Sequence, residues 1–339
     1  MGASTKKYLD PSLTSKGVIF TDLRTAEREH PKLLESIIGK LIQPNEGKFS
    51  SLSASLAQNG LILYVPKNIT LDKPLHSLFW GTGVNMAHIT HILLILDEGS
   101  SITYIHETGS SEDERMMHSG LVEIHVKNGA RLRFVELQSW GRKVWNFTHE
   151  RIRVEKNGHV DWLICAVGSQ LTKCFSDLEL SGEGSSGKIL GLYFSDGIQH
   201  LDYDTQQNHL VPNTTSDLLF KGAVTGNSYS VWRGKIRVAS GADKSDGYQS
   251  NRNLILDSNA RIDTIPGLEI LADDVRCSHG ATIGKMDDDQ IFYLMSRGID
   301  RKSAEQLIVE GFFEQIIEQI PSESAKNKLH QIIIEKFKH

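Results

Sequence analysis

The sequence predicts a mainly β protein whose core is a parallel β-helix, with α-helical regions flanking it at both ends. From about residue 61 to residue 285, short apolar runs are interrupted every several residues by Gly, Asn, Asp or Ser, and no helical period is present. Within this stretch, turn signals recur at Gly99, Gly129, Gly158 and Gly187, which are 30, 29 and 29 residues apart. A fixed period of this size is typical of coiled β folds, in which each repeat stacks on its neighbours and buries a continuous core.

An antiparallel sandwich or barrel stays open as an alternative, because Asn-Gly between apolar runs is also a strong hairpin signal. Two of the repeats match in texture, with Val-Glu-Ile-His-Val-Lys-Asn-Gly at residues 122–129 and Ile-Arg-Val-Glu-Lys-Asn-Gly at residues 152–158. The regular period favours the β-helix over the other two folds. We therefore assign residues 61–285 to a β-helix core.

Residues 1–60 are predicted to form an N-terminal helical region. After Pro31, apolar residues recur at helical spacing through residues 33–42 and give one apolar face. A second amphipathic segment covers residues 52–57, and Asn59-Gly60 behind it is a typical helix stop.

Residues 286–339 are predicted to form a C-terminal helical region. Asp287 is a suitable N-cap for a first helix that ends at Gly298, and a second helix begins near Asp300. Pro321 ends that helix, and Ser322 can cap the next one. The second helix carries an apolar face formed by Ala304, Leu307, Ile308, Phe312, Ile316, Ile317 and Ile320.

Composition and charge argue against several classes of function. The 339 residues include 42 acidic and 37 basic side chains, a net charge of −5, without the basic excess that nucleic-acid binding normally requires. The longest aliphatic run, residues 92–96, is far shorter than the ~20 residues of a membrane helix, and residues 1–21 lack the apolar core of a secretory leader. The three cysteines, Cys165, Cys174 and Cys277, are read as thiols of a reducing compartment. We expect a cytoplasmic protein that binds neither nucleic acid nor membranes.

A glycine-rich string at residues 182–188 matches G-x-G-x-x-G and nearly matches a phosphate-binding loop. Both motifs need a helix to follow, whereas residues 189–194 are strand-like. Ile189 also stands where a hydroxyl would hold Mg²⁺, and Gly187 falls on the turn register. We interpret the string as a turn.

Cys277-Ser278-His279 is the strongest metal-ligand signal. Side chains two residues apart on a strand share a face, so Cys277 and His279 could bind one soft metal ion. Two ligands are too few for a closed site, and a site shared between subunits would supply the others. The alternative, which spacing alone favours, is a buried Cys packing beside a hydrogen-bonded His. Sequence sets typical of hydrolases, zinc proteases or kinases are not found, which favours a scaffold over an enzyme.

Several motifs resemble the SufB/SufD family of iron–sulfur cluster assembly scaffolds, over essentially the whole chain. The most specific stretches are Asp273-Asp274-Val275-Arg276-Cys277-Ser278-His279-Gly280-Ala281-Thr282-Ile283-Gly284 and Gln290-Ile291-Phe292-Tyr293-Leu294-Met295-Ser296-Arg297-Gly298-Ile299. Upstream matches are Gly17-Val18-Ile19-Phe20-Thr21-Asp22-Leu23, Gln199-His200-Leu201-Asp202, Val211-Pro212-Asn213-Thr214, Tyr229-Ser230-Val231-Trp232-Arg233-Gly234-Lys235 and Tyr248-Gln249-Ser250. The resemblance implies a right-handed parallel β-helix flanked by helical terminal regions.

Two positions make the chain resemble SufD more than SufB. SufB proteins carry His-Glu-Ala-Thr where this chain has Gly280 in place of the acid, and a cysteine where this chain has Ala260. The resemblance implies that an iron–sulfur cluster is held transiently at a SufB–SufD interface, with His279 as this chain's ligand and Cys277 as a secondary one. It implies no nucleotide on this chain.

The implied partners are a SufB-like paralogue and two copies of SufC, an ABC-type ATPase that docks on the C-terminal helices. The docking side chains expected there are Phe292, Tyr293, Arg297, Leu307, Ile308 and Phe312. The isolated chain is expected to be able to form a homodimer through the same interface. Two other functions stay open, a β-helix enzyme acting on an extended polysaccharide and a metal-free homodimeric interaction module.

Overall fold

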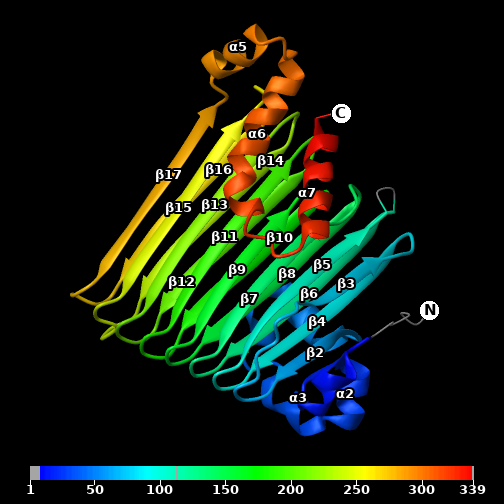
Figure 1. The fold of residues 1–339 in the computed structure, drawn as a ribbon, viewed down its shortest axis with the longest axis vertical. Helices are drawn as coiled ribbons and strands as arrows, with labels where there is room; N and C mark the ends of the chain where they lie inside the picture. The colour runs from blue at the N-terminus through cyan, green and yellow to red at the C-terminus, as the bar shows by residue number, and fades with distance from the viewer. Residues whose placement is uncertain (1–7, 112–113, 338–339) are drawn as a thin grey trace.

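The computed structural model of the chain describes residues 8–111 and 114–337. Its body is a parallel β-solenoid in which successive strands alternate between two facing sheets, called sheet A and sheet B, around a lumen (Figure 1). Sheet A contains, in spatial order, β1 (Ile19–Asp22), β2 (Asn59–Val65), β4 (Met86–Leu96), β6 (Met116–Val126), β8 (Val144–Val154), β10 (Leu171–Leu180), β12 (His200–His209), β14 (Tyr229–Val238) and β16 (Arg261–Ile270). Sheet B contains β3 (Leu75–Gly81), β5 (Ser101–Ser110), β7 (Arg131–Ser139), β9 (His159–Ala166), β11 (Ser186–Ser195), β13 (Thr215–Val224), β15 (Asp246–Ile255) and β17 (Arg276–Lys285).

The strand register confirms the predicted repeat, although its period varies along the solenoid. Strands β4 and β6 pair in parallel with an offset of 30 residues, and β10 and β12 with an offset of 29. The offset falls to 26 residues between β8 and β10 and rises to 32 between β14 and β16. The fold is therefore a parallel β-helix, and the sandwich and barrel alternatives are wrong.

Two of the four predicted turn positions need correction. In the third turn the left-handed residue is Asn157, with φ 54°, rather than Gly158, because Asn adopts this region more readily than most residues. In the fourth turn it is Gly184, with φ 73°, and Gly187 is the second residue of β11. Residues 182–185 of the glycine-rich string form a turn between strands β10 and β11, as predicted, while residues 186–188 already belong to β11, so a strand and not a helix follows the turn.

The N-terminal region contains α1 (Pro11–Ser15), α2 (Leu23–Glu29), α3 (Pro31–Ile37), the 3₁₀ turn η1 (Pro44–Glu46) and α4 (Lys48–Leu56). The helix predicted across residues 33–42 is too long, since α3 ends at Ile37. The reason is a distant side chain: the carboxylate of Glu123 in β6 accepts the backbone N–H groups of Gly39, Leu41 and Ile42 at 2.8, 2.6 and 3.2 Å. Because these N–H groups bond to Glu123, they do not form the backbone hydrogen bonds that would continue the helix.

Two further N-terminal details differ from the prediction. Helix α4 begins at Lys48, earlier than the predicted segment at residues 52–57, and Asn59-Gly60 opens β2 rather than ending a helix. Strand β1, which was not predicted, pairs antiparallel with β2 and covers that end of sheet A.

The C-terminal helices begin where the capping residues predict, but the second ends at Ile317, so Ile320, which was expected on its apolar face, lies outside it. They are α5 (Asp288–Ser296), α6 (Arg301–Ile317) and α7 (Glu323–Lys336). The side chains of Asp287, Asp300 and Ser322 each accept a backbone N–H of the first turn, and Gly298 has φ 88° after α5.

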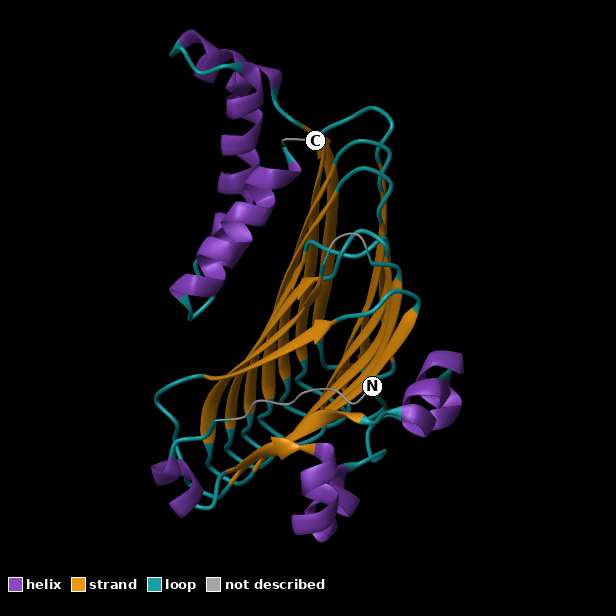
Figure 2. Ribbon diagram, turned by 90° about the vertical axis from the view of Figure 1, so that its right-hand side faces the viewer, coloured by secondary structure: helices purple, strands orange, loops and turns teal. Residues whose placement is uncertain are grey.

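The two largest apolar clusters of the molecule form two layers. The first fills the lumen between the sheets. The second lies between the outer face of sheet B and helices α6 and α7, where Leu163 and Leu192 pack with Val309, Phe313 and Ile333. Figure 2 shows these helices along one side of the solenoid. Helices α6 and α7 are therefore packed on the β core. Helix α5 lies beyond the carboxyl end of strand β17 (Figure 1).

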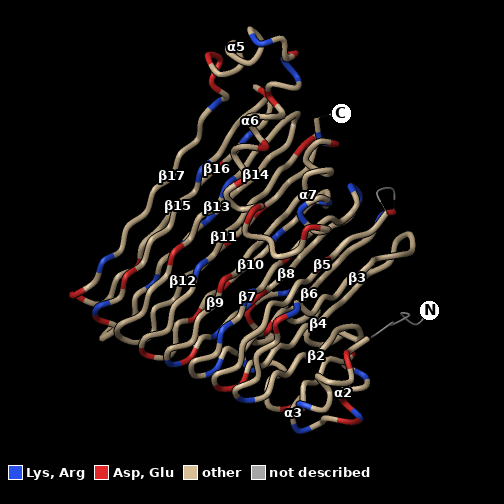
Figure 3. The backbone as a smooth tube through the Cα atoms, viewed as in Figure 1, with Lys and Arg blue, Asp and Glu red and all other residues tan. Residues whose placement is uncertain are grey.

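Basic and acidic residues alternate with one another along the backbone of the solenoid (Figure 3). On the outer face of sheet A, Arg151 contacts Asp177 at 2.5 Å, and Asp202 contacts Lys173 at 3.1 Å and Arg233 at 2.7 Å. The carboxylates named here are thus already ion-paired. In the described part of the chain, none of the helices is both long enough and apolar enough to cross a bilayer.

Candidate functional site

The C-terminal end of the solenoid is open. Strands β16 and β17 form the outer edges of sheets A and B, and among the described strands each pairs only with its inner neighbour, β14 or β15 (Figure 1). Four apolar side chains at this end are between 41% and 52% exposed: Ile265, Leu268, Leu271 and Ile283. Unpaired strand edges beside exposed apolar side chains are features of a surface that receives another chain.

Both sequence-predicted metal ligands lie on β17 at this open end. Cys277 is in register with Gly247 of β15, and His279 with Gln249, so the two side chains share a face as predicted. A Cβ built on Gly247 would lie 3.3 Å from the Cys277 sulfur and 3.1 Å from Ile236, which places Cys277 on the lumen side. His279 is exposed at the rim.

The chemistry of these two residues differs. Cys277 is half-buried against the apolar cluster around Ile236, and burial raises the pKa of its thiol above the ordinary value, so the thiol stays protonated at neutral pH. A protonated thiol is a poor metal ligand. Within the described residues, no group of three His, Cys, Asp or Glu side chains is arranged to hold a metal ion. The described residues of the open end therefore present one exposed imidazole, that of His279, and no complete metal site.

The polar groups behind His279 were not predicted from the sequence as site residues. The amide of Gln249 is fully buried and donates across the lumen to the carbonyls of Gly234 and Gly267, each at 3.2 Å. The Gln249 carbonyl oxygen and the indole N–H of Trp232 are buried, and each is without a hydrogen-bond partner among the described residues. The sequence signal for Gln249 and Trp232 was strand alternation, because every second side chain of a strand points into the lumen and both residues occupy such positions.

The expected docking side chains divide into two groups. Phe292, Tyr293 and Leu307 are 73%, 57% and 46% exposed, and the Arg297 guanidinium lies 5.3 Å from the Tyr293 ring centre. Ile308 and Phe312 are half-buried. The carbonyl of Phe312 accepts a 2.8 Å hydrogen bond from Lys221 of sheet B, and the ammonium lies 5.1 Å from its ring centre. The exposed apolar surface therefore lies on α5 and the start of α6.

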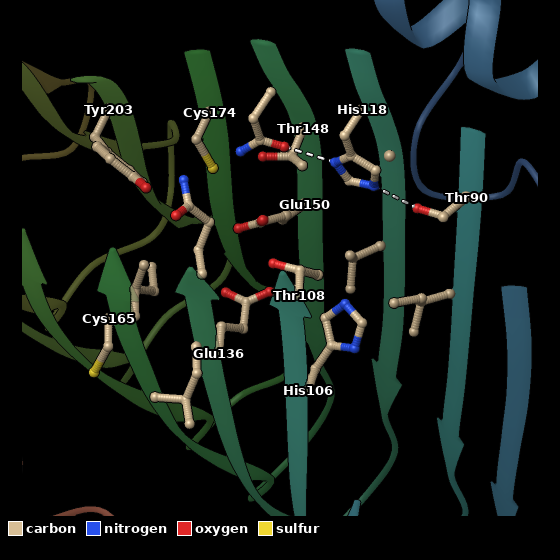
Figure 4. Close-up of a pocket in the computed structure, with 17 residues that line it drawn as sticks. Thr90, His106, Thr108, His118, Glu136, Thr148, Glu150, Cys165, Cys174 and Tyr203 are labelled. Carbon is tan, nitrogen blue, oxygen red and sulfur yellow. Dashed lines mark hydrogen bonds between the residues drawn. The ribbon is translucent and has the colours of Figure 1, made fainter. Parts of the chain in front are cut away.

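A second polar group, also missed from sequence, lies deep in the lumen (Figure 4). His118 of β6 connects the two neighbouring strands of sheet A, β4 and β8. Its ring nitrogens lie 2.9 Å from Thr90 Oγ1 and 2.6 Å from Asn146 Oδ1. Burial lowers the pKa of His118 to about 4, so its imidazole is neutral at physiological pH. Glu136 and Glu150 lie in the same cavity.

Comparison with known proteins gives consistent matches. A family model described as SUF system FeS cluster assembly, SufBD core domain, matches residues 79–312, and one described as SufBD protein N-terminal region matches residues 3–76. Iron–sulfur cluster assembly SufBD family proteins of Staphylococcus saprophyticus and Staphylococcus aureus are each 34% identical to this chain over 321 residues, and one of Staphylococcus epidermidis is 33% identical. Each alignment covers 94% of this chain and 68% of the relative.

Proposed function

This chain belongs to the SufBD family of iron–sulfur cluster assembly proteins, and on that premise we propose that it is a SufD-like, non-enzymatic scaffold subunit of the cytoplasm. The observation that carries the proposal is the open end of the solenoid, where unpaired edges of β16 and β17 flank the exposed His279. A SufB-like paralogue covers this end, and the cluster, which is cargo rather than a resident cofactor, forms transiently between the two chains.

The SufD-like assignment rests on Gly280 and Ala260. A Cβ built on Gly280 would meet only the Tyr248 hydroxyl, at 3.8 Å, so packing does not demand glycine there and an acidic side chain would fit. Ala260 is 8% exposed and packs with Val224 and Ile262, where it offers no ligand. Both positions lack the chemistry of a cluster-building SufB chain, so most of the cluster ligands come from the partner.

His279 contributes iron ligation through its imidazole, a ligand suited to iron. Cys277 is the secondary candidate, and its raised thiol pKa means that ligation would first require loss of a proton. Replacing His279 by Ala is expected to abolish cluster formation in the complex while the complex still assembles. Unchanged cluster yield, measured by anaerobic iron and sulfide assay, would exclude the ligand role.

An ABC-type ATPase of the SufC type docks on α5 and the start of α6, through Phe292, Tyr293 and Leu307, with Arg297 beside them and the half-buried Ile308 and Phe312 behind. Exposed aromatic side chains on a helix are typical anchors for a partner protein. Because α6 packs on the outer face of sheet B, movement of the docked ATPase is passed to the solenoid. The difference in binding energy between its open and closed states drives this change.

The docking proposal is tested by co-purification of the three proteins. The double substitution Phe292→Ala with Tyr293→Ala is expected to lose the ATPase and keep the SufB-like partner. The matched control is Ile198→Ala, which removes a side chain of similar exposure, 72%, from a turn of the solenoid. If the double variant retains the ATPase as the control does, docking on α5 is wrong. If the wild-type chain recovers neither partner, the scaffold proposal itself fails.

The same open end supports a homodimer of the isolated chain, because its edges and apolar side chains are available to a second copy. If the homodimer dissociates when the SufB-like chain is added, the second copy and the SufB-like chain compete for the same surface. The polysaccharide-enzyme alternative needs free carboxylates along one groove. On sheet A, Asp177 and Asp202 are instead held by Arg and Lys, which speaks against it.

A further inference from the structure

The polar cavity in the lumen contains two carboxyl groups in contact. It has a volume of about 40 Å³ and lies between strands of both sheets. Glu136 reaches it from β7 and Glu150 from β8, and the two carboxyls interact with each other. Figure 4 shows both side chains in the cavity. These side chains are 8% and 7% exposed, so the pair is removed from bulk water.

The charge of this pair has no cationic partner in the cavity. Among the described residues that line it, there is no Lys or Arg. The direct partners are neutral donors: the Trp162 indole N–H, 2.8 Å from Glu136, and the Ser176 hydroxyl, 2.9 Å from Glu150. Burial raises the pKa of Glu150 to about 7 and that of Glu136 well above its ordinary value. Buried carboxylates in proteins are normally paired with a cation or bound to a metal ion.

A second observation, independent of the carboxyls, also points to a ligand. Tyr203 is 2% exposed, and its hydroxyl points into the cavity without a hydrogen-bond partner among the described residues (Figure 4). The Cys174 thiol lies beside the pair, 3.2 Å from the Ser176 hydroxyl, and donates to Glu150. Cys165 also lines the cavity, but its side chain packs in the layer beneath α6 and α7. The cavity therefore has space for an ion, and it contains two carboxyl groups, a thiol and a hydroxyl that makes no hydrogen bond within the described part of the chain.

We propose that Glu136 and Glu150 bind one divalent transition-metal ion of the Fe²⁺, Co²⁺ and Zn²⁺ class, with Cys174 as a third ligand. Carboxylate and thiolate ligands together favour such ions over Mg²⁺ and Ca²⁺. The ion replaces the proton between the two carboxyls, and the thiol proton leaves to solvent. The described residues contain no three such side chains already arranged around one point, so Cys174 moves toward the ion on binding. This site is separate from His279 and does not depend on the proposed scaffold function.

The test uses the full-length chain, stripped with chelator and dialysed anaerobically against Co²⁺, with metal content and visible absorption as readouts. The His279→Ala chain serves as the background, so that binding at the open end does not contribute. It is expected to retain one Co²⁺, and adding Glu136→Gln or Glu150→Gln is expected to weaken retention by at least about tenfold. Adding Cys174→Ser is expected to remove the thiolate charge-transfer absorption.

The matched control is Glu179→Gln, which changes a carboxylate on the outer face of β10 and is expected to bind Co²⁺ like the background. Circular dichroism establishes that each variant is folded. The proposal is overturned if the background chain retains no Co²⁺, or if the Glu136→Gln and Glu150→Gln chains retain it equally. If neither Gln variant folds, the Cys174→Ser spectrum decides, because an absorption spectrum identical to that of the background excludes the cavity.

Discussion

The imidazole Nε2 of His91 lies 2.8 Å from a carboxylate oxygen of Glu123, and the two side chains are only 3% and 0% exposed. The same carboxylate accepts three backbone N–H groups from residues 39–42. Burial acts to raise the pKa of Glu123, but the hydrogen bonds from His91 and from the backbone outweigh it, and the pKa lies below its ordinary value. One side chain of β6 therefore fastens the N-terminal segment to sheet A.

Replacing Glu123 by Gln is expected to lower the free energy of unfolding by about 1–3 kcal/mol, because buried N–H groups lose a charged acceptor. Urea unfolding measures this loss, and hydrogen exchange of residues 39–42 locates it. Since the folded pKa is lowered, the stabilisation is present above pH 4.5 and is lost as the pH falls through the folded value. The exposed Glu98, paired with Lys67, is the control, and Glu98→Gln is expected to have no measurable effect. Equal losses in both variants would contradict the role of Glu123.

The end of α7 is held by a buried ion pair. The Lys336 ammonium, in a side chain 3% exposed, donates to Asp196 and to Gln199, and Arg142 contacts the other oxygen of Asp196 at 2.7 Å. Lys336→Met is expected to cost about 3 kcal/mol, because it leaves a buried carboxylate partly uncompensated. Limited proteolysis should then cleave within α7 faster than in the wild type.

The control for this substitution is Lys326→Met on the same helix, whose partner Glu323 is 82% exposed. Exposed pairs contribute little to stability, so unfolding and proteolysis of this variant are expected to match the wild type. If Lys336→Met behaves like the control, then α7 is held by its apolar face alone.

Elements set by neighbouring residues were predictable. The repeat followed from turn residues, and the starts of α5, α6 and α7 followed from Asp287, Asp300 and Ser322, because capping involves only the next few residues. Elements set by distant residues were not. Helix α3 ends at Ile37 because of Glu123, which is 82 residues from Leu41 in sequence.

The candidate sites show the same division. The shared face of Cys277 and His279 followed from strand alternation, but the burial that keeps Cys277 protonated depends on Ile236 in another coil. The contact between Glu136 and Glu150 depends on how two sheets face each other across the lumen, and spacing along one strand does not show it. The sequence signal for Glu136 and Glu150 was strand alternation, because both are acidic residues at inward-facing positions of their strands.

The first glycine of the glycine-rich string is needed for packing. A Cβ built on Gly182 would lie 1.9 Å from the backbone nitrogen of Lys156 in the neighbouring turn. Gly182→Ala therefore forces the backbone apart and is expected to destabilise the fold by about 3 kcal/mol in urea unfolding. Gly284→Ala is the control, because a Cβ there meets nothing within 4 Å. A Gly182→Ala chain as stable as this control would disprove the packing role.

The lumen carboxyl pair is expected to give the metal-free protein a pH dependence opposite in sign to that of Glu123. The folded pKa of Glu150 is raised to about 7 from 4.5, chiefly by burial, so the folded state holds a proton that the unfolded state has released. Its stabilisation is therefore complete below about pH 4.5 and is lost as the pH rises through about 7. In chelator, Glu150→Gln is expected to reduce this decline, of which Glu136 still contributes its own part, and to unfold at higher urea than the wild type at pH 8, because a neutral amide carries no buried charge. The same decline in both chains between pH 5 and pH 8 would show that the pair does not hold this proton.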